Sequence, residues 1–267
     1  MIWQLLVLGL VQGVTEFLPV SSSAHLILPS ALLGWPDQGA TFDVAVHLGT
    51  LTAVLISLRK TVLPVCRDSW RQITGTAPAT CNSRLGWFLV VATVPAVLFG
   101  ALVSLTGWDE RLRSTAVLAL ATLLFGLLLG WADRMGSRQQ PMEKLTFRQV
   151  IIIGLCQALA IIPGTSRSGI TITAALMLGL SREAAANFSF LLSIPVIMAA
   201  STLKMFSLIT ADSPVLWNEL IFGMVVSGVS GYLCIRCFLT FINRLGMMPF
   251  VVYRLLLGAI LISVAWL

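Results

Sequence analysis

Charge is the scarcest property of this chain. Only 10% of its 267 residues are Asp, Glu, Lys or Arg, whereas a typical soluble domain has about 25%, and the mean hydropathy is +0.94. The net charge of +6 comes from 17 Lys and Arg spread over short segments between apolar runs, which is not the basic stripe that binds nucleic acid. We therefore expect an integral membrane protein with no nucleic-acid partner.

Several cofactor and cross-link patterns are also missing. The five cysteines are an odd number and lie in a basic segment or in apolar runs, which excludes a disulfide framework. The sequence has no zinc-type ligand cluster, no glycine-rich nucleotide loop and no acidic pair for two-metal chemistry. We expect no tightly bound cofactor. The first apolar run has no basic leader and no cleavage site, so we interpret it as a retained segment.

Long apolar runs are what the chain does have. A membrane crossing takes about 20 mostly apolar residues, and about six such runs are present. They cover residues 42–58, 85–106, 113–131, 184–207, 215–235 and 250–267. Two further apolar regions, 1–34 and 149–180, are each broken in the middle by proline and small polar residues, and we interpret both as re-entrant helical hairpins. The predicted fold class is an all-α polytopic membrane protein that forms a single domain.

The basic residues predict the topology. Segments 59–84 and 132–148 carry most of the Lys and Arg between crossings. Because basic loops stay on the cytoplasmic side of a membrane, we predict that both are cytoplasmic loops. The other connecting segments then alternate between the two sides of the membrane, and the C-terminus lies on the outer side.

The two broken regions resemble each other. "GLVQGVTEFLPVSS" from Gly9 and "GLCQALAIIPGTS" from Gly154 share Gly, Leu and Gln in register, followed by Pro and Ser. Three predicted crossings separate them, so the hairpins enter the membrane from opposite sides. We predict inverted repeats at approximately 1–112 and 147–267, linked by a helix at 113–131. Broken helices at matching positions of inverted repeats indicate a binding site near the midplane.

Small polar residues at both breaks favour an anion. Free N–H groups at a helix N-terminus bind phosphate, helped by hydroxyl groups at the capping positions. The candidate phosphate-binding residues are Ser21, Ser22, Ser23, Gly164, Thr165, Ser166 and Ser168. Arg167 lies among them, and an arginine at membrane depth requires a cavity and a partner. That partner is either phosphate or Glu16, and the two do not exclude each other.

Glu16 is expected to point inward with Gln12, which lies four residues earlier on the same helix face. It can act as a base, orient another group, hold a divalent cation or neutralise Arg167. Gln12 and Gln157 occupy matching repeat positions and can equally serve only to satisfy the backbone at each break.

Ser22 and His25 are three residues apart, the spacing at which a hydroxyl nucleophile and an imidazole acid or base share one helix face. Any of the three serines can be the reacting one, and capping is the alternative role for all of them. His47 lies in the first full crossing, and we expect it to be a packed or hydrogen-bonded core residue.

These residues carry a family resemblance. "QGVTEFLPVSSSAH" and "PGTSRSGIT" resemble the two signature motifs of the undecaprenyl-diphosphatase family, the bacitracin-resistance proteins, and "NFSFLLSIPV" extends the similarity. The resemblance implies a bacterial inner-membrane enzyme that hydrolyses undecaprenyl diphosphate to undecaprenyl phosphate and inorganic phosphate. That reaction recycles the lipid carrier for peptidoglycan and envelope polymer synthesis and gives bacitracin resistance. It also implies a site that opens to the periplasmic side, and a homodimer.

The resemblance also assigns roles by position. It implies that Ser22 is the nucleophile, His25 the motif histidine, Arg167 the motif arginine, and Gln12 with Glu16 the acidic face. The remaining polar positions of the motifs fall on Ser21, Ser166, Ser168 and Thr171. Many members have glutamate where this chain has Gln12, which weakens any mechanism with two carboxylates. At most a loosely held Mg²⁺ or Ca²⁺ at Glu16 is expected.

We expect Arg167 and the N–H groups of the breaks to hold the terminal phosphate while Ser22 attacks it, with Glu16 or His25 taking the serine proton. Direct attack by water is the open variant. A transporter or flippase for a phosphorylated polyprenyl lipid is the alternative function, because it shares every feature except the chemistry. The histidine-nucleophile lipid phosphatases require a histidine after the arginine motif, and none follows His47.

Overall fold

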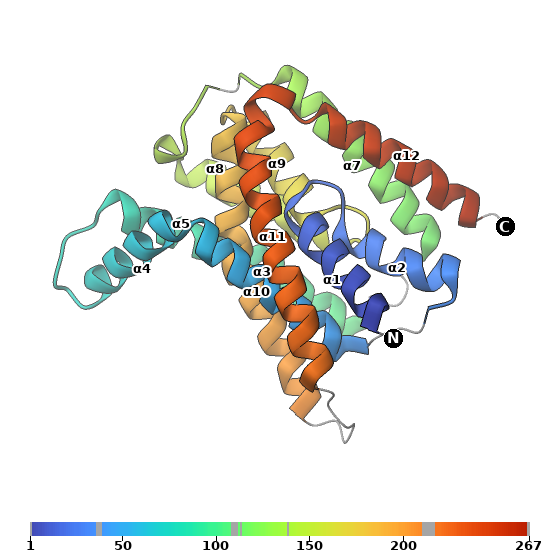
Figure 1. Ribbon diagram of the computed structural model, residues 1–267. Helices are drawn as coiled ribbons and strands as arrows, with labels where there is room; N and C mark the ends of the chain where they lie inside the picture. The colour runs from blue at the N-terminus through green and yellow to red at the C-terminus, as the bar shows by residue number, and fades with distance from the viewer. Residues whose placement is uncertain are drawn as a thin grey trace.

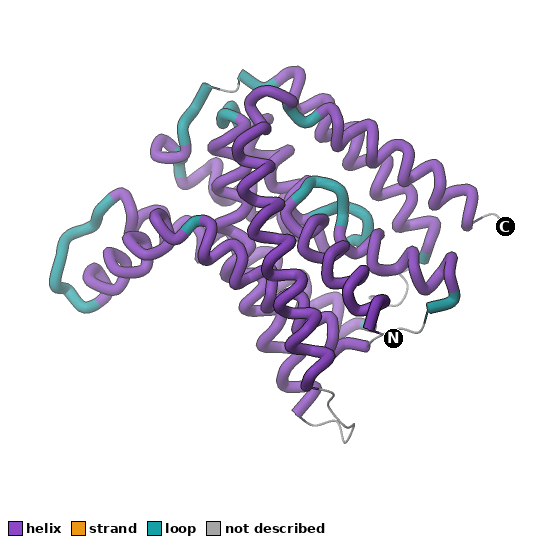
Figure 2. Tube along the Cα trace, in the orientation of Figure 1, coloured by secondary structure: helices purple, strands orange, loops and turns teal. Residues whose placement is uncertain are grey.

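A computed structural model describes residues 2–35, 39–107, 112, 114–137, 139–209 and 217–265. This part of the chain consists of helices and connecting segments, with one isolated β-bridge and no strand (Figures 1 and 2). The helices are α1 (Ile2–Phe17), α2 (Ser22–Leu33), α3 (Gly39–Ser57), α4 (Arg59–Ile73), α5 (Cys81–Thr106), α7 (Thr115–Met135), α8 (Phe147–Ala158), α9 (Arg167–Met177), α10 (Arg182–Ile209), α11 (Trp217–Leu245) and α12 (Met248–Ala265), with 3₁₀ turns at Met142–Lys144 and Leu159–Ile161.

The all-α membrane fold class is confirmed. Four helices, α5, α7, α10 and α11, are long and apolar enough to cross a membrane, and the bent pair α3 and α4 gives up to five spans. The apolar stretch Met248–Ser263 of α12 is shorter than the 18 residues required of a membrane span. The count of six crossings therefore stays a prediction.

Both predicted breaks are present. α1 ends at Phe17 and α2 begins at Ser22, while α8 ends at Ala158 and α9 begins at Arg167. Ser21 and Ser166, which directly precede α2 and α9, have φ values of 74° and 67°. They are the described non-glycine residues with positive φ, a region that L-residues rarely occupy. The two breaks thus share one unusual backbone conformation at the start of the returning helix.

The hairpins interlock with the long helices. α1 packs against α11 and α8 packs against α5. α1 and α11 run parallel, because Gly9 and Gly13 lie opposite Val226 and Ser230 in the same order along both helices. A Cβ at Gly154 would lie 2.7 Å from the Ala92 oxygen on α5, so this glycine also marks a close helix approach. The matching contacts agree with a twofold arrangement, while the repeat boundaries and the linking helix stay predictions.

Segment 59–84 was predicted as a loop, and this prediction is wrong for its first part. Arg59–Ile73 forms α4, which is bent by 88° from α3 and packs against α5 (Figure 1). The helix buries Val65 and Asp68 while its basic residues point outward, so the charges that indicated a loop belong to one face of an amphipathic helix. A hydrogen bond from Asn82 joins Asp68 on α4 to the start of α5, and this bond, followed by one from Arg67, lowers the pKa of Asp68.

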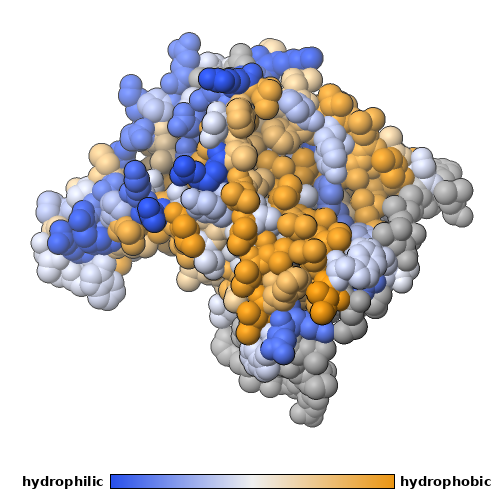
Figure 3. Space-filling model, in the orientation of Figure 1, coloured by the Kyte–Doolittle hydropathy of each residue, from blue (hydrophilic) through white to orange (hydrophobic). Residues whose placement is uncertain are grey.

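The surface has separate hydrophilic and hydrophobic areas, as a membrane protein requires. Figure 3 shows hydrophilic residues over α4 and over the segment that joins α7 to α8, and hydrophobic residues over much of α11. The interior holds the returning helix α9, in which Ser168 to Leu176 are all buried. The second hairpin is therefore enclosed by protein on every side of its returning helix.

Candidate functional site

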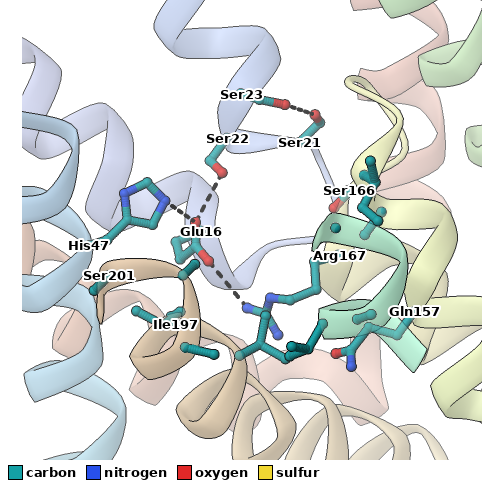
Figure 4. Close-up of a pocket in the computed structure, with 18 of the residues that line it drawn as sticks. Glu16, Ser21, Ser22, Ser23, His47, Gln157, Ser166, Arg167, Ile197 and Ser201 are labelled. Carbon is teal, nitrogen blue, oxygen red and sulfur yellow. Dashed lines mark hydrogen bonds and ion pairs between the residues drawn. The ribbon is translucent and has the colours of Figure 1, made fainter. Parts of the chain in front are cut away.

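A pocket of about 370 Å³ opens where the two breaks meet (Figure 4). One wall is polar and is formed by Glu16, Ser21, Ser22, Ser23, His47, Gln157, Ser166, Arg167 and Ser201. The other wall consists of small or aliphatic side chains from α5, the 3₁₀ turn Leu159–Ile161 and α10. The pocket therefore combines a hydrophilic end with an apolar end.

Glu16 is the centre of the polar wall. Its Oε2 accepts hydrogen bonds from Gln12 Nε2 and Ser22 Oγ, both at 3.0 Å, and its Oε1 lies 3.3 Å from Arg167 Nη2. Glu16 is only 8% exposed, so these partners compensate a largely buried carboxylate. Gln12 and Glu16 thus lie on one face of α1, and Glu16 forms an ion pair with Arg167.

The two breaks are joined to each other by α9. Ser166 caps this helix by accepting the Gly169 N–H at 3.1 Å, and Ser168 Oγ donates to the Leu18 oxygen in the first break at 2.8 Å. Arg167 donates to the Ser189 oxygen at 3.1 Å in addition to its pairing with Glu16. The guanidinium is held from two sides at the edge of the pocket.

The three serines of the first break all line the pocket. Ser22 Oγ faces Glu16 in Figure 4, while the hydroxyl groups of Ser21 and Ser23 are 3.1 Å apart and bond to each other. Ser22 is the serine whose hydroxyl group already donates to a carboxylate. A hydroxyl group in that position can lose its proton to the carboxylate as it attacks.

His25 is not among the residues that line the pocket, and its expected role beside Ser22 stays a prediction. Its Nδ1 lies 2.7 Å from the Ser21 oxygen and its Nε2 lies 2.5 Å from Tyr253 Oη, with the two rings stacked. Ser22, the first residue of α2, bonds to Glu16 of α1, whereas His25 contacts Tyr253 of α12. Three-residue spacing gives neighbours on a helix but does not fix which element each of them faces.

His47 was expected to be a packed or hydrogen-bonded core residue; its ring is hydrogen-bonded to the Asp43 oxygen at 2.7 Å, but the residue is only half-buried and does not belong to the core. It lines the pocket, its side chain is 32% exposed, and its Nε2 lies 3.8 Å from Glu16 Oε2. The available signal was a polar residue within an apolar crossing, which by default indicates a functional position.

The remaining candidate residues lie behind the pocket wall. Gln12, Thr165, Ser168 and Thr171 are buried and are not part of the lining. Thr171 Oγ1 bonds to Ser189 Oγ at 2.7 Å. Gly164 has a φ of 91°, and a Cβ there would lie 2.3 Å from the Leu118 oxygen of α7. Gln12 supports Glu16 through its hydrogen bond, while Gly164, Thr165, Ser168 and Thr171 hold the shape of the second break.

Arg254 is a buried residue of this region that sequence reasoning missed. It is 0% exposed and donates to five backbone oxygens, those of Pro19, Ala121, Thr122, Gly164 and Thr165, at 2.8 to 3.4 Å. It therefore ties both breaks to α7. An arginine inside the apolar run 250–267 was the signal, by the same reasoning that identified Arg167.

Metal ligands are sparse in the described part of the chain. Within it, no group of three or more His, Cys, Asp and Glu side chains is arranged to hold a metal ion. Glu16 and His47 are the nearest approach to such a group at the pocket. A cation there would take its other ligands from substrate oxygens or water.

Comparisons with known proteins extend over nearly the whole chain. The sequence model of the family described as bacitracin resistance protein BacA matches residues 5–260. A protein named undecaprenyl-diphosphatase from Chromohalobacter salexigens is 56% identical over 255 residues, 96% of each chain. Proteins of the same name from Alteromonas mediterranea and Nitrosococcus oceani are 51% and 52% identical over 262 and 257 residues, at least 96% of each chain.

Proposed function

The chain belongs to the bacitracin resistance protein BacA family, and we propose that it hydrolyses undecaprenyl diphosphate to undecaprenyl phosphate and inorganic phosphate. It is an undecaprenyl-diphosphate phosphatase that recycles the lipid carrier for peptidoglycan and envelope polymer synthesis and gives bacitracin resistance. The hydrogen bond of 3.0 Å from Ser22 to Glu16, beside Arg167, is the observation that carries the proposal.

The two-sided pocket suits a polyprenyl diphosphate lipid. The serines and Arg167 offer hydroxyl groups and a guanidinium to the diphosphate, and the N-termini of α2 and α9 add N–H groups and favourable dipoles. The first isoprene units of the tail would lie along the apolar wall, whose small residues include Ala96, Gly100 and Ala200. The rest of the tail would remain in the lipid.

The mechanism starts with the terminal phosphate held by Arg167 and the N–H groups of the breaks. Ser22 Oγ attacks the phosphorus in line, Glu16 takes its proton, and undecaprenyl phosphate leaves. Water then releases the phosphate from Ser22. Glu16 is better placed than His25 for the proton transfer, because its carboxylate already accepts the Ser22 hydrogen bond while both ring nitrogens of His25 have other partners.

A loosely held Mg²⁺ or Ca²⁺ is part of the proposal. Glu16 would supply the protein ligand and the substrate phosphates the remaining oxygens, since hard divalent cations prefer oxygen ligands. Every proton and phosphoryl transfer above is assigned to residues of this chain, and the ion would add positive charge near the phosphates.

We place the protein in the bacterial inner membrane with the pocket open to the periplasmic side. The lining residues of α5, Ala96 to Ala101, lie far from Cys81, where the helix leaves the basic α4 region. Those of α10, Val196 to Ser201, are likewise distant from Arg182. The positive-inside rule puts the basic ends in the cytoplasm, which supports a pocket in the opposite half. A homodimer is proposed from the family resemblance alone.

The Ser22→Ala variant separates hydrolysis from transport. Binding of undecaprenyl diphosphate and release of phosphate are measured on purified wild type and variant in detergent. A hydrolase with Ser22 as nucleophile keeps substrate binding and loses phosphate release. A lipid transporter has no use for the hydroxyl group as a nucleophile, so equal behaviour of the two proteins, with no phosphate released by either, would favour transport.

A further inference from the structure

His47 reaches the same carboxylate oxygen as Ser22 from a different helix (Figure 4). Its Nε2 lies 3.8 Å from Glu16 Oε2, and Ser22 Oγ lies 3.0 Å from that same oxygen. The imidazole comes from α3, whereas Glu16 and Ser22 come from the first hairpin. Three separate elements thus bring a hydroxyl group, a carboxylate and an imidazole to one point.

The hydrogen bond at the other ring nitrogen sets the tautomer. His47 Nδ1 lies 2.7 Å from the backbone oxygen of Asp43, one turn earlier on α3. A carbonyl oxygen only accepts, so Nδ1 carries the hydrogen in the neutral ring and Nε2 presents a lone pair. That lone pair is on the side of the ring that faces the pocket. The arrangement prepares Nε2 to accept a proton.

The charges around His47 come from few groups. Of the described residues that line the pocket, Glu16, His47 and Arg167 are the titratable ones. α10 contributes Ser201 there, α11 meets α3 through Ser227, which donates to the Val46 oxygen, and Asp43 precedes His47 on its own helix. Since Glu16 and Arg167 are paired with each other at 3.3 Å, the imidazole is the group left to exchange a proton with water.

We propose that His47 is a further catalytic residue, the base that activates water in the second half of the reaction. This inference rests on the proposed hydrolase function. Glu16 is the one carboxylate among the described residues that line the pocket. The imidazole would supply a second proton acceptor there.

Each proton moved in the two half-reactions has a donor and an acceptor. In the first half, the Ser22 Oγ–P bond forms, Glu16 takes the hydroxyl proton, and the bridging P–O bond breaks to release undecaprenyl phosphate. In the second half, water attacks the phosphoserine, His47 Nε2 takes a proton from that water, and the Ser22 Oγ–P bond breaks. Ser22 recovers its proton from Glu16, inorganic phosphate leaves, and His47 returns its proton to solvent.

The test uses His47→Gln in the full-length purified protein, with Thr52→Ala as the matched control on the exposed face of α3. Product formation from substrate labelled in the terminal phosphate is followed by rapid quench. We expect the variant to release about one equivalent of undecaprenyl phosphate in a burst, to retain the label on Ser22, and to turn over about 100-fold more slowly. Thr52→Ala should behave like wild type.

A further readout separates catalysis from a structural role. The pH dependence of kcat is compared between wild type and His47→Gln, and loss of a catalytic base should change the profile.

The outcomes are distinct. If wild type releases phosphate and Ser22→Ala does not, the hydrolase proposal stands whatever His47→Gln does. The inference about His47 is overturned if His47→Gln matches wild type in rate and pH profile. It is equally overturned if the variant loses activity without a burst or labelled serine.

Discussion

Arg254→Met removes the guanidinium that connects the two hairpin breaks while keeping a long side chain in its place. Five backbone oxygens lose a donor. Two of them, on Ala121 and Thr122, belong to α7 and lie within a regular helix. The other three, on Pro19, Gly164 and Thr165, lie in the breaks, where the backbone provides fewer donors.

The loss in free energy of unfolding comes mainly from the three oxygens in the breaks. A buried acceptor left without a donor costs about 1–3 kcal/mol. Thr122 Oγ1 lies 3.4 Å from the Gly164 oxygen and can remain as a weak donor, so two oxygens are left fully unpaired. The expected loss is therefore at least about 2 kcal/mol, a large share of the roughly 5–15 kcal/mol by which a folded domain is stable.

The assay compares unfolding in detergent, followed by tryptophan fluorescence, with phosphate release by the same samples. Arg236→Met on the exposed surface of α11 is the control for loss of a positive charge, and Arg254→Lys, with three donors instead of five, should be intermediate. Arg254→Met should unfold at lower temperature and lose activity, because the breaks no longer position Ser22 and Arg167. An unfolding curve and a rate equal to those of wild type would refute the reasoning.

Three further predictions concern helix contacts and the cation. Gly13→Ala places a Cβ 1.9 Å from Ser230 Oγ and should cost about 1–3 kcal/mol in unfolding experiments, whereas Gly100→Ala, whose Cβ has no neighbour closer than 3.9 Å, should cost nothing. Asp133→Asn weakens the bonds of 2.6 and 2.8 Å from Arg182 and should lower unfolding stability by about 2 kcal/mol; an unchanged curve would contradict this. EDTA should slow turnover without changing the unfolding temperature, and Mg²⁺ or Ca²⁺ should restore it; full activity in EDTA would exclude the cation.

The sequence predicted the hairpin breaks because their cause is local. Proline and clustered small polar residues interrupt apolar runs of the length that a helix needs, and such interruptions are visible without a structure. The shared face of Gln12 and Glu16 is equally local, since it depends only on helical periodicity. The pairing of Arg167 with Glu16 could be anticipated because a buried arginine requires a partner and few acids were available near the breaks.

The positions of the histidines depend on how helices pack and could not be predicted in this way. A Cβ at Gly49 would lie 2.2 Å from the Met224 oxygen, so that face of α3 is pressed against α11. His47 lies two residues earlier, about 200° around the helix, and therefore faces the pocket. The hydropathy of residues 42–58 contains no information about which way α3 is rotated.

Averaged composition also concealed two other features. Arg254 is one charge within a strongly apolar run, so the average over 250–267 hides the residue that joins the breaks. In segment 59–84 the high density of basic residues indicated a loop, although Val65 and Asp68 form a buried face of α4. In both segments, the positions of the charged and apolar residues around the helix axis determine the structure, and their number alone does not show it.

The central claim is tested most directly by phosphate release from undecaprenyl diphosphate, using purified protein in detergent with Mg²⁺ or Ca²⁺ present. The account predicts turnover by wild type and a loss of at least about 100-fold, roughly 2.7 kcal/mol of barrier, in folded Ser22→Ala and in folded Arg167→Ala. A folded wild-type protein that releases no phosphate, or variants that release it at the wild-type rate, would contradict a catalytic site at the meeting point of the two hairpins.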